Sequence, residues 1–112
     1  MTDGDAQSLV DQLALAAADL PGVERHEAGD GSFEWRIAGK PFAAARPPNE
    51  TSYLLDPAVA AAALRTPDAE PSPRGPEWVS FRPAVLDRFA LDRASAWLES
   101  AWRRADSNRR RN

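Results

Sequence analysis

Hydrophobic and polar residues alternate along residues 32–45 in the pattern of two strands joined by a tight turn. Phe33, Trp35 and Ile37 are separated by single charged residues, which is the period of a half-buried strand. Ala38-Gly39 follows, and glycine readily adopts the positive φ that a tight hairpin turn requires. The pattern therefore predicts a β-hairpin, around which the rest of the chain is organised.

The length of the turn decides which residues of the hairpin face each other. If Ala38-Gly39 is the whole loop, the pairs are Ile37 with Lys40, Trp35 with Phe42, and Phe33 with Ala44. The Trp35 and Phe42 rings then lie together on the buried side of the sheet. A type I turn with a bulge at Gly39 is the alternative, because a type I′ turn also needs positive φ at Ala38. That alternative shifts the register.

Three segments carry helix signals. Residues 3–20 place Leu9, Leu13, Ala16, Ala17 and Leu20 on one apolar stripe, with Asp3 and Asp5 near the start and Pro21-Gly22 after the end. Residues 58–65 follow Asp56 as N-cap and Pro57 at the first helical position. Residues 85–105 keep helical spacing from Leu86 to Ala101, with Asp87 or Asp92 as the cap.

Shorter apolar segments between turns predict further strands at residues 23–26, 51–55 and 77–82. In the last of these, Trp78 and Ser80 face one side and Val79 and Phe81 the other. Residues 66–76 contain four prolines and are expected to form an exposed loop. The order of elements predicts an α+β domain over residues 1–105, an antiparallel sheet packed by N-terminal, middle and C-terminal helices. Residues 106–112 are expected to be a disordered, arginine-rich tail.

Composition excludes several kinds of chemistry. The 112 residues contain no cysteine and one histidine, His26, so thiolate catalysis, disulfides and His-rich metal sites are absent. No serine stands in a nucleophile-elbow setting and the carboxylates are scattered, so we expect a protein that is not an enzyme and holds no metal or cofactor. The acidic N-terminus and the lack of a long apolar run predict a cytoplasmic protein without a membrane span.

Charge is distributed unevenly along the chain. Residues 103–112 hold five arginines against Asp106, a local charge of +4, which leaves −7 for the rest of a chain whose net charge is −3. Four basic residues of the sheet, Arg36, Lys40, Arg46 and Arg82, are candidates for a nucleic-acid-binding patch. Isolated strand arginines are more often solvated residues of the outer face, and the acidic body repels polyanions. Trp78 and Trp102 are candidates for a protein-interaction surface, since tryptophan is enriched at interface hot spots.

Four motifs in order resemble the MmcQ/YjbR-like family. They are Leu20-Pro21-Gly22-Val23-Glu24, the hairpin over residues 33–43, Trp78-Val79, and Ala101-Trp102-Arg103. The resemblance spans about residues 8–105, and Gly39 and Lys40 match the hairpin tip of the family, whereas Asp30-Gly31 replaces a basic residue that often precedes the first wing strand. It implies a single α+β domain similar to the frataxin-like CyaY fold, DNA binding through a double wing of β-hairpins, and no enzymatic activity.

Two functions follow as hypotheses. The first is weak binding of duplex DNA through the hairpin, with the C-terminal arginines adding phosphate contacts. The second is a non-enzymatic module that binds a protein partner or a small ligand around Trp78, Trp102 and the proline-rich loop. A contiguous positive hairpin face favours the first hypothesis, and a mixed face favours the second. Nothing in the sequence indicates an oligomer, and a monomer is expected.

Overall fold

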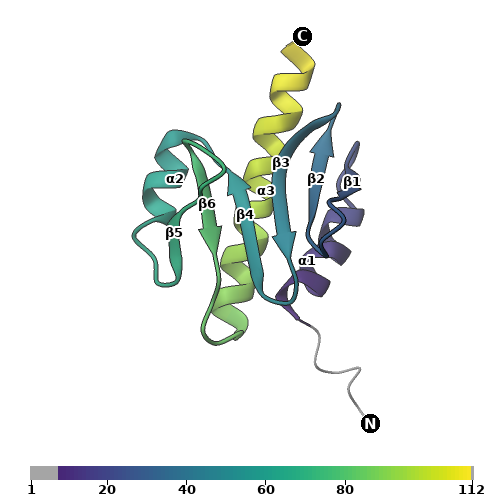
Figure 1. The fold of residues 1–112 in the computed structure, drawn as a ribbon. Helices are drawn as coiled ribbons and strands as arrows, with labels where there is room; N and C mark the ends of the chain where they lie inside the picture. Colours follow the sequence, from purple (N-terminus) through teal and green to yellow (C-terminus); the bar gives the residue numbers. More distant parts are fainter. Residues whose placement is uncertain (1–7, 112) are drawn as a thin grey trace.

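The computed structural model describes residues 8–111, and these residues form an α+β fold with one antiparallel sheet. The sheet order is β1-β2-β3-β4-β6-β5 (Figure 1). Its strands are β1 (Glu24–Glu27), β2 (Phe33–Ile37), β3 (Lys40–Arg46), β4 (Glu50–Leu54), β5 (Ala69–Pro71) and β6 (Trp78–Phe81). The helices are α1 (Leu9–Ala18), α2 (Pro57–Ala63) and α3 (Arg88–Arg111). This confirms the predicted fold class.

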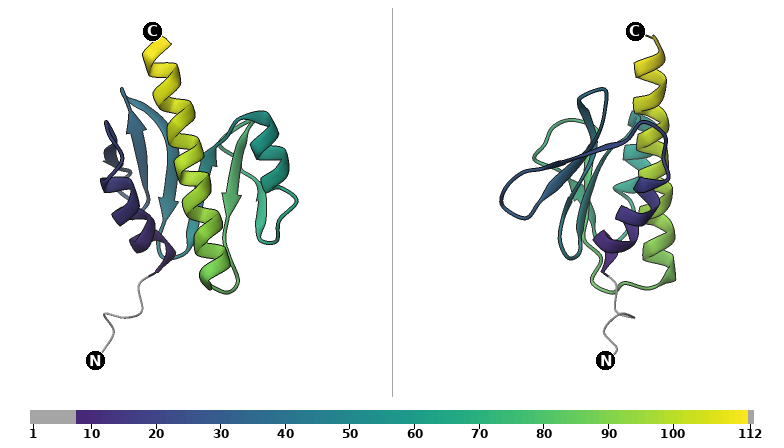
Figure 2. Two further views of the ribbon diagram at one scale, coloured as in Figure 1. Left: turned by 180° about the vertical axis from the view of Figure 1, so that it is seen from behind. Right: turned by 90° about the vertical axis from the view of Figure 1, so that its right-hand side faces the viewer.

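The core lies between one face of the sheet and the helices α1 and α3 (Figure 2). Paired residues of neighbouring strands present their side chains to this core in rows, such as Ala43 of β3, Tyr53 of β4 and Val79 of β6. Trp97 of α3 completes the packing, with its ring centroid 5.9 Å from that of Tyr53 and 5.1 Å from that of Phe81. The long helix therefore lies against the middle of the sheet.

The hairpin turn is the two-residue loop, but the strands pair differently beyond it. Ala38 and Gly39 both have positive φ, 52° and 81°, and Ile37 pairs with Lys40 as expected. The register shifts between Trp35 and Arg36, so Phe42 becomes an extra residue and Trp35 pairs with Ala43. The predicted facing pairs of Trp35 with Phe42 and of Phe33 with Ala44 are therefore wrong. Both rings are nevertheless buried in the same core cluster.

The helix starts differ in detail from the predictions. Ser8 caps α1, its Oγ accepting a hydrogen bond from the Asp11 amide, so the helix begins at Leu9. The predicted segment 3–7, with Asp3 and Asp5, lies outside the described residues. Within α1, Val10 is buried, and Ala16, which was expected to lie on the buried stripe, is exposed. The Asp87 carboxylate accepts a hydrogen bond from the Ala90 amide, which selects Asp87 over Asp92 as the cap of α3.

Two segments that were expected to be irregular are regular. Ala69–Pro71 forms the short edge strand β5 inside the predicted loop, because it pairs antiparallel with β6. Residues 106–111, which were expected to be disordered, instead form the last turns of α3, which ends at Arg111. Asp106 lies within ion-pair distance of Arg109 and Arg110, three and four positions later, a spacing that supports a helix. No helix of the described chain is long and apolar enough to cross a membrane.

Candidate functional site

The four basic residues predicted to bind nucleic acid do not gather in one place. Lys40 is at the hairpin tip, and Arg46 ends the same strand six residues later, a distance of about 20 Å along β3. Arg46 pairs with Glu50, and Thr51 pairs with Phe81, so Arg82 follows β6 at the same end of the sheet as Arg46. Lys40 is therefore separated from Arg46 and Arg82 by the length of the sheet.

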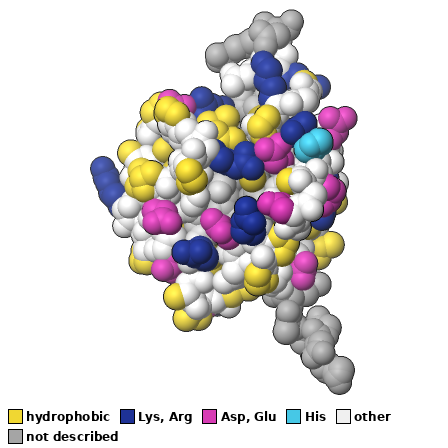
Figure 3. Space-filling model, viewed as in Figure 1, with side chains coloured by type: hydrophobic (Ala, Val, Ile, Leu, Met, Phe, Trp, Pro, Cys, Tyr) yellow, Lys and Arg dark blue, Asp and Glu magenta, His cyan; other side chains and the backbone are white. Residues whose placement is uncertain are grey.

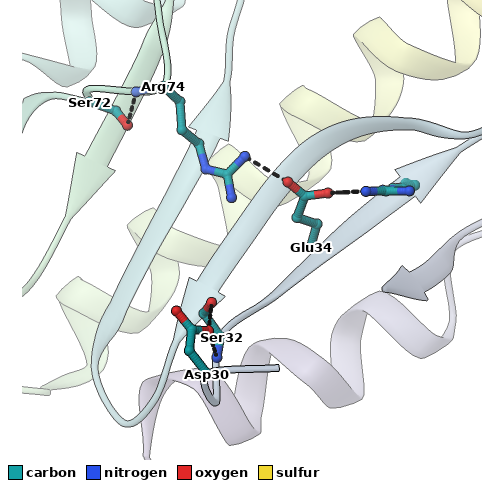
Figure 4. Close-up of polar contacts among 6 residues, drawn as sticks. Asp30, Ser32, Glu34, Ser72 and Arg74 are labelled. Atoms are coloured by element: carbon teal, nitrogen blue, oxygen red, sulfur yellow. Dashed lines mark hydrogen bonds and ion pairs between the residues drawn. The ribbon is translucent and has the colours of Figure 1, made fainter. Parts of the chain in front are cut away.

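Carboxylates pair with Arg36, Arg46 and Arg74 on the open face, which is the face away from α1 and α3. The Glu34 carboxylate accepts hydrogen bonds from Arg36 Nε and Arg74 Nη1, each at 2.9 Å (Figure 4). Arg46 Nη2 lies 3.7 Å from an Asp30 carboxylate oxygen. Figure 3 shows basic and acidic side chains interspersed over this face. By the criterion set above, a mixed face disfavours DNA binding through the open face of the hairpin.

The pKa values of two carboxyls reflect these partners. Partial burial by itself raises the pKa of Glu34, but the hydrogen bonds and charges of Arg74 and Arg36 outweigh it and hold that pKa below its ordinary value. The pKa of Asp30 is also lowered, first by hydrogen bonds from the Ser32 hydroxyl and amide and then by the charge of Arg46. Both residues are therefore firmly ionised near neutral pH, which keeps the face mixed in charge.

A pocket lies between the hairpin tip and the last turns of α3. Its volume is about 170 Å³. Buried side chains of Ile37, Phe42 and Ala101 line its interior, together with the partly exposed Leu54 and Ala105. Its polar lining consists of Lys40, Arg104, Asn108 and Arg109, and the remaining lining residues are Ala38 and Pro41 of the hairpin tip. We call this the tip pocket.

The cations of the tip pocket differ in how firmly they are held. Arg104 is fixed: Nη1 donates a hydrogen bond to the Leu55 carbonyl at 2.6 Å, and the guanidinium also contacts the carboxylates of Asp56 and Glu77. Arg109 is paired with Asp106 on its own helix. Among residues 8–111, Lys40 forms no ion pair and is exposed. Lys40 is therefore the cation most available to an incoming anion.

Asp106 organises the arginines at the end of α3. Its carboxylate oxygens contact Arg109 Nη2 and Arg110 Nε, and the hydrogen bond from Arg109, followed by the charges of both arginines, lowers the pKa of Asp106. Arg103 pairs with Glu99, one turn earlier on the same helix. The charges of this end are thus the exposed cations Lys40, Arg103, Arg109 and Arg110 against the exposed Glu99 and the buried Asp106, a small positive excess.

The sequence contained a signal for the helical side of the tip pocket. Ala101, Arg104, Ala105 and Asn108 follow the i, i+3, i+4, i+7 spacing of one helix face, which continues the stripe that was predicted up to Ala101. Because the predicted helix ended at residue 105, this face was not followed as far as Asn108. Contact between this face and the hairpin tip is tertiary, and no local pattern encodes it.

The two candidate interaction tryptophans are engaged within the molecule. Trp102 Nε1 donates a hydrogen bond to the Pro21 carbonyl at 2.9 Å, which ties α3 to the turn after α1. Trp78 lies under the guanidinium of Arg74, whose Cζ is 5.0 Å from the ring centroid. Both side chains are partly buried. Each therefore has a packing role within the fold.

A second, more polar pocket of about 260 Å³ lies on the open face. Ser52 and Ser80 line it, with their hydroxyl oxygens 3.2 Å apart, and Arg46, Glu50 and Arg74 border it. Its charged residues are of both signs. His26 stands apart on β1 and is exposed. Within the described part of the chain, no three His, Cys, Asp or Glu side chains gather as a metal site would require.

Comparisons with known proteins identify no relative of this chain, so its function has to be argued from the site alone. The chain matches no family model, no curated protein and no solved structure.

Proposed function

We propose that this protein is an MmcQ/YjbR-like domain that binds duplex DNA weakly and without sequence preference. The contact surface would be the tip of the β2–β3 hairpin and the neighbouring end of α3. The observation that carries the proposal is that Lys40 of the tip and Arg109 of the helix line the same pocket, so the wing and the arginine run share one end of the molecule. The resemblance of residues 33–43 to the family hairpin supports it.

The proposed surface differs from the one predicted from the sequence. Arg36 and Arg46 are paired with carboxylates on the open face, and Arg82 lies at the far end of the sheet, so these three are left out. Lys40 remains, joined by Arg103, Arg109 and Arg110, whose side chains are 44% to 75% exposed. Exposed lysine and arginine contact phosphates by releasing counterions from the duplex, which needs no base readout.

The charge balance argues for low affinity. Glu99 and Asp106 lie among these cations, and the chain as a whole has a net charge of −3. Nonspecific DNA binding at physiological salt typically has a dissociation constant of roughly 10⁻⁴ to 10⁻⁶ M, and we expect this weaker binder to reach that range only at low salt. The proposal includes no catalytic step and no cofactor, and we expect the domain to act in the cytoplasm as a monomer.

Fluorescence anisotropy with a random labelled duplex tests this proposal. Binding should weaken with salt, with a log–log slope of about −3 if three or four phosphates are neutralised. The double variant Lys40→Glu/Arg110→Glu should reduce affinity at least tenfold. Its control is Arg46→Glu/Arg82→Glu, which makes the same change in charge at the other end of the sheet and should have a much smaller effect.

Two results would contradict the proposal. One is the absence of binding at ~100 μM protein in low salt, which lies within the expected range of affinity. The other is an equal loss of affinity in both double variants, because this would indicate a response to net charge rather than to the tip surface. A protein-interaction surface at Trp78 and Trp102, the alternative function, has less support because both rings are held by contacts within the chain.

A further inference from the structure

We infer that the tip pocket is a binding site for a small organic anion, an aryl or short alkyl carboxylate. This site shares Lys40 and Arg109 with the proposed DNA contact, but it also requires the apolar interior of the pocket, which the DNA contact does not use. Three properties of the pocket point to such a ligand: its size, its apolar interior and the charge of its lining.

The size of the pocket matches one small ring. Its volume is about 170 Å³. An apolar protein cavity of about 150 Å³ lined by leucine, isoleucine and phenylalanine is large enough to bind benzene. The interior here is of the same kind, formed by Ile37 and Phe42 of the hairpin, Leu54 of β4 and Ala101 of α3. A single aromatic ring or a chain of a few methylenes would therefore fill the pocket.

The lining is cationic and contains no acid. Lys40, Arg104 and Arg109 are its charged members, and Asn108 adds an amide donor. The carboxylates that hold Arg104 and Arg109, which belong to Asp56, Glu77 and Asp106, are not part of the lining. A ligand carboxylate in the pocket would thus meet three cationic side chains and the Asn108 amide, and no carboxylate of the lining. A cationic or neutral ligand of the same size lacks that attraction.

The arrangement of exposed and buried residues sets the orientation of the ligand. Ile37, Phe42 and Ala101 are buried, whereas Lys40, Asn108 and Arg109 are exposed. The apolar part of the ligand would enter between the hairpin and α3, and its carboxylate would stay at the rim beside Lys40. Few interior contacts and a partly solvated ion pair give low affinity, with a Kd on the order of 1 mM or somewhat below.

Titration of the ¹⁵N-labelled protein with phenylacetate tests the inference by NMR. Shift changes should concentrate at residues 37–42 and 101–109 and saturate. Benzyl alcohol and phenethylamine, which keep the ring but lose the negative charge, should bind at least fivefold more weakly. Ala105→Phe should fill the pocket and lower phenylacetate affinity at least tenfold. Its matched control is Ala96→Phe, an exposed position nine residues earlier on α3 and outside the tip pocket, which should leave affinity unchanged.

Two further variants make the test decisive. Asn108→Trp blocks the rim from an exposed position, so it tests occupancy of the pocket even if Ala105→Phe perturbs folding. Lys40→Gln should weaken phenylacetate binding about fivefold and leave benzyl alcohol binding unchanged, because it removes one exposed charge partner. Equal affinities for the three probes, or phenylacetate binding that survives both Ala105→Phe and Asn108→Trp, would overturn the inference.

The outcome is separable from that of the DNA proposal. Ala105→Phe retains every charge at the end of the molecule and should bind duplex DNA like the wild type while losing phenylacetate. Arg110 is not part of the pocket lining, so Arg110→Glu should weaken DNA binding and leave phenylacetate binding nearly unchanged. Either proposal can therefore fail while the other stands.

Discussion

Arg104 of α3 reaches Glu77, which immediately precedes β6, with Nη2 and Oε1 2.7 Å apart. The backbone at Glu77 has a φ of 70°, and its carbonyl accepts a hydrogen bond from the Leu55 amide. The same guanidinium donates to the Leu55 carbonyl and contacts Asp56, the N-cap of α2. One side chain of the last helix thus connects the end of β4, the start of α2 and the start of β6.

Replacing Arg104 should therefore destabilise the fold. Arg104→Ala leaves the Leu55 carbonyl without its side-chain donor and removes the partner of Glu77, and we expect a loss of about 2 kcal/mol in the free energy of unfolding. Arg104→Lys should recover little, because an ammonium cannot match the fork of a guanidinium. Urea denaturation measures both. The control is Arg103→Ala, whose partner Glu99 is mostly exposed and whose loss should cost less than about 0.5 kcal/mol.

A buried pair of hydroxyls offers a second test of stability. Thr51 and Tyr53 of β4 are fully buried, with Oγ1 and the phenol oxygen 2.7 Å apart. Burial raises the pKa of Tyr53 far above its ordinary value, so the phenol stays protonated at accessible pH. Tyr53→Phe and Thr51→Val should each cost about 1–2 kcal/mol by leaving one buried hydroxyl unsatisfied.

The double variant tests whether the hydroxyls of Thr51 and Tyr53 interact or contribute to stability independently. Removing both hydroxyls leaves no unsatisfied group, so Thr51→Val combined with Tyr53→Phe should cost less than the two single changes together by at least ~0.5 kcal/mol. Urea unfolding of the four proteins completes the cycle. Additive losses would mean that the two hydroxyls do not interact.

The fold could be predicted because its signals are local. The period-2 alternation in residues 33–37 and the Asp56-Pro57 helix start depend only on neighbouring residues, and the structure confirms both. A bulge was considered only at Gly39, so the bulge at Phe42 was missed, although Pro41 carried a signal for it. Proline lacks an amide proton for the ladder and tends to occur at bulges, and here Pro41 pairs with Arg36 beside the extra residue Phe42.

The candidate site was less predictable because tertiary contacts create it. The pairing of Arg74 with Glu34 joins residues 40 positions apart, and no spacing rule would find it. The tip pocket likewise requires the end of α3 to lie beside the hairpin tip. Of the four basic residues proposed from the sequence, only Lys40 lies in that pocket. The sequence identified the basic residues, but only the structure shows which carboxylates pair with them and so which cations remain free to bind an anion.

The hairpin turn carries backbone strain that substitution should relieve. Ala38 has a φ of 52°, a left-handed conformation that costs a residue with a Cβ about 1–2 kcal/mol. Ala38→Asn creates the Asn-Gly pair favoured in such turns and should raise the free energy of unfolding by about 0.5–1 kcal/mol. Gly39→Ala should lower the free energy of unfolding, since φ is 81° there. A Cβ at this position meets no atom within 4 Å, so the loss would come from the backbone conformation alone. Thermal unfolding of the two variants should therefore shift the midpoint in opposite directions.

The Glu34 carboxylate should make stability dependent on pH in the acidic range. Its folded pKa lies below the ordinary value of 4.5, so its contribution is complete above that value and is lost as pH falls through the lowered folded pKa. Glu34→Gln should cost about 1 kcal/mol near neutral pH, a modest figure because its partners Arg36 and Arg74 are partly solvated. The gap in the free energy of unfolding between the wild type and Glu34→Gln should then narrow as pH drops below 4.5. Arg74→Gln provides the companion measurement: it should raise the pKa of Glu34 in an NMR titration. A gap that is constant from neutral to acidic pH would show that the Glu34 charge contributes nothing to stability.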